Sequence, residues 1–110
     1  MSIVRAHVSI QGQQKTITIE KIRAILEQDH SLPPMVRVIF KDFLILNSDH
    51  LQMLINIALD SILRPSHLSQ FQKILPPEIA GYDHELLDIL ACAMGLNAIH
   101  CKEQSTRVTE

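Results

Sequence analysis

The sequence predicts a mainly α-helical protein, a compact bundle of four to five helices with a small N-terminal β-hairpin, on the border of the α+β class. Apolar and polar side chains alternate, as they do in a strand, only before residue 19. Beyond that point apolar side chains recur every three or four residues, which is the period of an amphipathic helix. Proline-containing breaks divide this helical part into segments of ordinary helix length.

The N-terminal hairpin is predicted from two extended runs. Residues 3–10 alternate loosely, whereas residues 15–19 alternate well and are rich in β-branched side chains. Residues 11–14, Gln-Gly-Gln-Gln, have the composition of a turn. We therefore expect a hairpin over about residues 1–19.

Two helices are predicted between residues 19 and 46. The first follows Thr18, a residue type that caps helix N-termini, and it ends near Asp29 because Pro33 and Pro34 cannot continue a helix. Pro34 suits the first turn of the second helix, which Asn47 closes. Apolar residues mark one face of the first helix: Ile19, Ile22, Ile25 and Leu26.

A third helix is predicted over residues 49–63, with Ser48 as its cap. This segment is apolar except for a narrow stripe, so we expect it to be buried on most sides. The stripe consists of Asp49, Gln52, Asn56 and Asp60.

Two shorter helices complete the prediction. Ser66 is expected to cap the fourth, over residues 67–75, and Asp83 the last, over residues 84–94. Gly95 suits the position just after the last helix, where the backbone turns into a left-handed conformation.

The C-terminal end is predicted to be less regular. Residues 96–101 read as a short strand that returns to the hairpin, and residues 104–110 as a frayed, solvated tail. We thus expect one helical domain over residues 1–103, followed by the tail.

Composition excludes several classes of protein. A chain of 110 residues that is 46% hydrophobic forms one domain and buries enough apolar surface to fold. Its net charge of −2 gives no overall electrostatic footprint for nucleic acid or an anionic membrane, although a local basic patch stays open. The chain has neither a signal-peptide hydrophobic region nor an uninterrupted apolar stretch long enough for a membrane span. The default expectation is a cytoplasmic protein. Its two cysteines, Cys92 and Cys101, are compatible with reduced thiols, and a single disulfide between them stays open.

One stretch resembles a metal-binding pattern. His84-Glu85-x-x-Asp88 differs by one residue from the motif of zinc proteases, and Cys92 follows on the same helical face. Asp replaces the second histidine, however, and no further ligand has a recognisable spacing. The sequence therefore predicts an ordinary amphipathic helix without a metal. The alternative is a metal-dependent enzyme, with His84, Asp88 and Cys92 as the metal ligands and Glu85 as the base.

No other residues predict catalysis or a cofactor. His100 and Cys101 are adjacent, but neighbouring side chains of a strand point to opposite faces, which opposes a nucleophile and base pair. The sequence thus predicts a non-enzymatic protein with no catalytic residues and no cofactor.

A second alternative is a dimeric DNA-binding transcriptional regulator. Residues 49–75 could form a helix-turn-helix-like unit, with Ser69, Gln70 and Lys73 as the side chains that touch DNA. Only Arg64 and Lys73 are basic nearby, whereas phosphate contacts supply most of the affinity for DNA. Nucleic acid is therefore not the favoured partner.

The favoured function comes from a surplus of apolar surface. The second and third predicted helices have few polar positions, and a domain this small covers only part of such surface with its own core. We expect a small cytoplasmic interaction protein (an adaptor, chaperone-like or regulatory protein) that acts through an apolar helical surface, as a homodimer or by binding a protein partner. The hairpin and remaining helices could instead cover this surface. The residues expected in the core or the interface are Val36, Ile39, Phe40, Phe43, Leu51, Leu54, Ile55 and Ala58.

Overall fold

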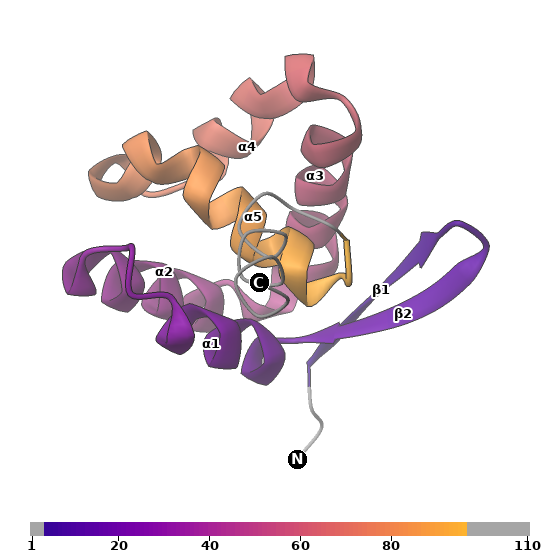
Figure 1. Ribbon diagram of the computed structural model, residues 1–110, viewed down its shortest axis with the longest axis horizontal. Coiled ribbons are helices and arrows are strands. Elements are labelled where there is room, and N and C mark those ends of the chain that lie inside the picture. The colour runs from indigo at the N-terminus through magenta and orange to yellow at the C-terminus, as the bar shows by residue number, and fades with distance from the viewer. Residues whose placement is uncertain (1–3, 97–110) are drawn as a thin grey trace, which may run out of the picture.

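The computed structural model describes residues 4–96 and confirms the predicted class: five α-helices follow a two-stranded antiparallel hairpin (Figure 1). Short 3-10 helices (η) lead into the third, fourth and fifth α-helices. In chain order the elements are β1 Arg5–Ile10, β2 Gln13–Thr18, α1 Ile19–Gln28, α2 Pro34–Leu46, η1 Ser48–His50, α3 Leu51–Leu63, η2 Pro65–His67, α4 Leu68–Ile74, η3 Pro77–Tyr82 and α5 Asp83–Ala93.

The hairpin turn is tighter than the sequence predicts. Only Gln11 and Gly12 connect the strands, and their φ angles of 53° and 79° are those of a two-residue turn whose twist matches the strands. Residues 13 and 14, predicted as part of the turn, instead pair with Ile10 and Ser9. The prediction was wrong in this detail because two glutamines carry no strong preference for either state.

A side-chain amide fixes the hairpin to the helical part. The Gln52 amide of α3 accepts from the His7 N–H at 2.8 Å and donates to the His7 carbonyl at 2.9 Å. It thus occupies the outer edge of β1 in the place of a third strand. Ala6, Val8 and Ile17 are buried on one face of the hairpin.

The predicted helix caps are confirmed in part. The Thr18 hydroxyl accepts from the Lys21 N–H at 3.1 Å, as expected of an N-cap. The predicted roles of Ser48 and Ser66 were wrong, because each serine lies in a 3-10 turn that precedes its helix. Asp83 was also predicted as a cap, but it is the first residue of α5. Its carboxylate accepts from the His84 N–H at 2.8 Å.

Helix α5 lies at the centre of the fold, between α1, α3 and α4 (Figure 1). The sequence suggested an ordinary amphipathic helix, but Leu87 and Ala91 are buried in addition to the predicted apolar face. The largest fully buried side chains of the core come from all five α-helices, from η3 and from β2: Phe40, Phe71, Ile17, Ile22, Leu26, Leu44, Leu51, Ile55, Ile79, Leu86, Ile89 and Leu90.

The end of α5 confirms the predicted role of Gly95. Its φ of 76° is left-handed, its N–H donates to the Cys92 carbonyl, and the Leu96 N–H donates to the Ala91 carbonyl. These two bonds define a Schellman motif, which satisfies carbonyls that the helix leaves unpaired. The predicted strand over 96–101, apart from its first residue, and the predicted tail over 104–110 lie outside the described residues.

Candidate interaction surface

Most of the residues predicted for the core or the interface lie in the core. Six are buried, and Ile39 and Phe43 are partly buried against the same core. Helix α3, which holds four of them, packs against β1, α4 and α5. The six buried members of the set are Val36, Phe40, Leu51, Leu54, Ile55 and Ala58.

Helix α2 nevertheless exposes a second apolar face. Met35 is 70% exposed, Val38 51%, Ile45 48% and Leu46 83%. At 100° per residue these four residues, together with partly buried Ile39, fall within about 120° of the helix circumference, opposite the buried residues Val36, Phe40 and Leu44. We call the set of Met35, Val38, Ile39, Ile45 and Leu46 the α2 stripe.

The sequence predicted surplus apolar surface on both α2 and α3. Four of the five residues of the α2 stripe were not among those named for the core or the interface. The pattern of α2 is apolar nearly all round, so the buried side could not be told from the exposed side. The exposed large hydrophobic residues of other elements, such as Met53 and Leu63 of α3, lie outside the stripe. Among residues 4–96, α2 carries more of them than any other element.

Charged side chains adjoin the α2 stripe. Asp42 is exposed and lies inside its arc, whereas Lys41 and Arg37 are half-buried and flank it on one side. Among the described residues none of these three has an ion-pair partner within 4 Å; the pair formed there is His67–Asp60, at 2.6 Å. The face is therefore apolar with one carboxylate at its centre and two cations at its edge.

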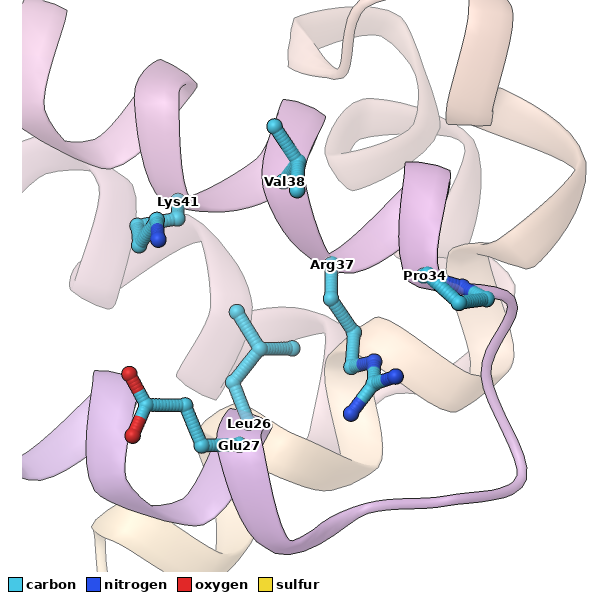
Figure 2. A pocket seen from close by; sticks show the side chains of 6 residues that line it. All are labelled: Leu26, Glu27, Pro34, Arg37, Val38 and Lys41. Atoms are coloured by element: carbon cyan, nitrogen blue, oxygen red, sulfur yellow. The ribbon is translucent and has the colours of Figure 1, made fainter.

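A small cavity lies beside the stripe, between α1 and α2 (Figure 2). It measures about 180 Å³. Figure 2 shows that Arg37 extends from α2 toward α1, whereas Val38 points away from α1. The Arg37 Nε atom is buried and has no hydrogen-bond partner among the described residues. The lining residues are Leu26, Glu27, Pro34, Arg37, Val38 and Lys41.

A second hollow of about 90 Å³ lies near the C-terminal end of α2. It is predominantly apolar and joins α2 to α3 and α4. Phe43 of α2 and Met53, an exposed apolar residue of α3, both line it. Its lining residues are Phe43, Asn47, His50, Met53, Leu54 and Ile74.

The residues of the metal alternative lie on one helix but do not form a metal centre. His84 and Glu85 are exposed, and Asp88 and Cys92 are half-buried. Cys92 is disulfide-bonded, so it offers no thiolate. Within residues 4–96 no three histidine, cysteine or acidic side chains come together as metal ligands would. His100 and Cys101 lie outside the described residues.

The residues of the DNA-binding alternative are brought together. Ser69, Gln70 and Lys73 are all exposed and share one face of α4. Arg64, just before η2, is exposed as well. Helix α4 has seven residues, however, so the face is only two turns long.

Neither a membrane span nor a known relative gives a further indication of function. Over the described part of the chain, no helix combines the length and the apolar character needed to cross a bilayer. Comparison of the sequence with protein families and with curated proteins, and of the fold with solved structures, finds no significant match.

Proposed function

We propose that this protein is a small non-enzymatic interaction protein that forms a homodimer through the α2 stripe. The observation that supports the proposal is the exposure of four large apolar side chains on one face of one helix, Met35, Val38, Ile45 and Leu46. Scattered apolar residues are normal on a protein surface, but a contiguous patch of them is typical of an interaction site.

The energy of burial favours a partner with an equally apolar face. Covering a large side chain that is about half exposed or more contributes roughly 1–1.5 kcal/mol. Two stripes facing each other would remove eight such side chains from water, or roughly 8–12 kcal/mol, which is comparable to the cost of association. A polar partner would offer only half of this gain. A second copy of the chain supplies the missing half.

The mass of the protein in solution, measured by light scattering during size-exclusion chromatography from about 1 to 100 µM, tests the proposal. We expect a dimer that dissociates on dilution. Leu46→Asp should give a monomer, because it buries a carboxylate at the interface. Leu63→Asp is the matched control, since Leu63 is 66% exposed but lies on α3, and it should remain dimeric. A monomeric wild type at 100 µM would disprove the proposal.

DNA binding is the second candidate, favoured by the common exposure of Ser69, Gln70 and Lys73 on α4. It predicts that random duplex DNA shifts in a gel at low salt and that Lys73→Ala weakens the shift. The α2 variant Leu46→Asp would separate the two candidates further, because a dimeric DNA-binding protein loses affinity when its dimer dissociates. No shift at micromolar protein would exclude this function.

The cytoplasm remains the proposed compartment. The disulfide at Cys92 is the observation that opposes it, because protein disulfides persist mainly in oxidising compartments. Trapping of free thiols with an alkylating reagent in intact cells, followed by mass measurement, tests the assignment. A cytoplasmic protein should be recovered with both cysteines alkylated.

A further inference from the structure

We propose that the cavity between α1 and α2 binds a small monocarboxylate whose body is compact and apolar (Figure 2). Three apolar and three charged side chains line this cavity, and all of them belong to one chain. The site is therefore complete without a second copy, so it goes beyond the proposed function and does not depend on the homodimer.

Arg37 supplies the cavity with a cation that has no counter-ion among the described residues. Its side chain extends from α2 toward α1, and its buried Nε atom makes no hydrogen bond within residues 4–96 (Figure 2). No carboxylate of this part of the chain lies within 4 Å of the guanidinium. A half-buried cation without a counter-ion favours an anion from solution, because pairing offsets the loss of hydration.

The other two charges of the wall lie apart from Arg37. Figure 2 shows Lys41 and the Glu27 carboxylate on the same side of Leu26, away from the Arg37 guanidinium. Two cations and one anion leave the wall with a charge of +1. A monoanion balances this charge, whereas a phosphate dianion would leave an excess negative charge. A carboxylate is the monoanion that suits Arg37, because a guanidinium donates two parallel hydrogen bonds to its two oxygens.

The rest of the wall favours an apolar ligand body. Leu26, Pro34 and Val38 line the cavity together with the charged residues. The volume is about 180 Å³, and a cavity of about 150 Å³ is enough for a benzene ring. A ring that bears one carboxylate, as in benzoate, thus matches both the space and the cation. An inorganic anion would leave the apolar side chains in contact with water and should bind more weakly.

Titration with sodium benzoate, followed through the backbone amide signals of isotope-labelled protein by NMR at constant ionic strength, tests the site. We expect saturable shifts at residues 26–27 and 35–41, with a dissociation constant of about 1 mM or less, which is ordinary for a ligand of this size. Benzamide has nearly the same shape but no charge, and it should bind about tenfold more weakly or worse. Sodium phosphate should give no saturable shifts at these residues.

Substitutions identify the cation that holds the carboxylate. Arg37→Gln should weaken benzoate binding by about tenfold or more. Arg23→Gln is the matched control, because Arg23 is also half-buried with an unpartnered Nε atom among the described residues, but it does not line the cavity. It should leave the dissociation constant unchanged. Glu27→Gln should strengthen binding, because it removes the negative charge of the wall.

Several results would overturn the site. They are an absence of saturable shifts up to about 10 mM benzoate, equal affinity for benzamide or phosphate, or an affinity in Arg37→Gln no weaker than in Arg23→Gln. A Glu27→Gln protein that binds benzoate less tightly than the wild type would also contradict the charge balance. The comparison of benzoate with benzamide uses the wild type alone, so it decides the question even if Arg37→Gln does not fold. None of these results bears on the mass of the protein in solution, which tests the homodimer separately.

Discussion

Thr18 connects the hairpin to the first helix through one hydrogen bond, from the Lys21 N–H to its hydroxyl at 3.1 Å. Thr18→Ala removes the acceptor and leaves that N–H without its partner. We expect the free energy of unfolding to fall by about 1 kcal/mol. Thr18→Ser keeps a capping hydroxyl and should retain most of the stability. Urea denaturation of both variants measures the difference, and an equal loss in both would show that the hydroxyl does not act as a cap.

Gly95 ends α5 in a conformation that side chains disfavour. Gly95→Ala should destabilise the protein by about 1 kcal/mol, because a Cβ at a φ of 76° is strained. That Cβ would also lie 2.7 Å from the Lys15 Nζ atom, the mobile end of a side chain that can move away.

Gly81 provides the control for this substitution. A Cβ there meets no atom within 4 Å and its φ is not left-handed. Gly81→Ala should therefore leave the midpoint of urea denaturation unchanged or raise it slightly. If the two alanine variants were equally destabilised, backbone strain at Gly95 would not be the cause.

These residues also show how far local sequence determines local structure. Thr18 and Gly95 could be predicted because each acts through bonds within a few residues of itself. Ser48 and Ser66 have the same kind of sequence context as Thr18, but each lies within a 3-10 turn that precedes its α-helix. Sequence reasoning cannot distinguish a cap from a turn when both place a serine before an apolar run.

At the scale of elements, Gln52 is the link between the helical part and the hairpin. Its amide makes two hydrogen bonds to the backbone of His7, 45 residues away. Gln52→Ala should cost about 1 kcal/mol and should increase the hydrogen-exchange rate of the His7 amide. Gln72→Ala, at an exposed position of α4, should change neither quantity. Unchanged protection of His7 in Gln52→Ala would contradict the role of this link.

Helix α2 illustrates what the sequence of an element leaves open. Its apolar composition correctly predicted that it holds surplus apolar surface. Which side is surplus depends on α1 and η3, which cover the face that includes Phe40 and Leu44. Those contacts are non-local, so Val38 could not be separated from Phe40 by periodicity, although one is half-exposed and the other fully buried.

At the scale of the whole molecule, the class and the helix order follow from the sequence, but the arrangement does not. The central position of α5 results from its contacts with helices that lie far away in the chain. For the same reason the set of residues expected in the core or the interface was found mostly in the core. The candidate surface could be named only after the packing of all five helices was known.

We expect the α2 stripe to make the stability of the whole molecule depend on its concentration. A protein that dimerises in its native state is stabilised by mass action, because only folded chains associate with each other. Over a hundredfold rise in protein concentration we expect the melting temperature to rise by roughly 5 °C. Leu46→Asp should melt at one temperature over this range, because its charge keeps the stripes apart, and Leu63→Asp should retain the wild-type dependence. Thermal unfolding followed by circular dichroism measures all three proteins. A wild-type melting temperature that is independent of concentration would mean that the exposed face of α2 does not hold two chains together.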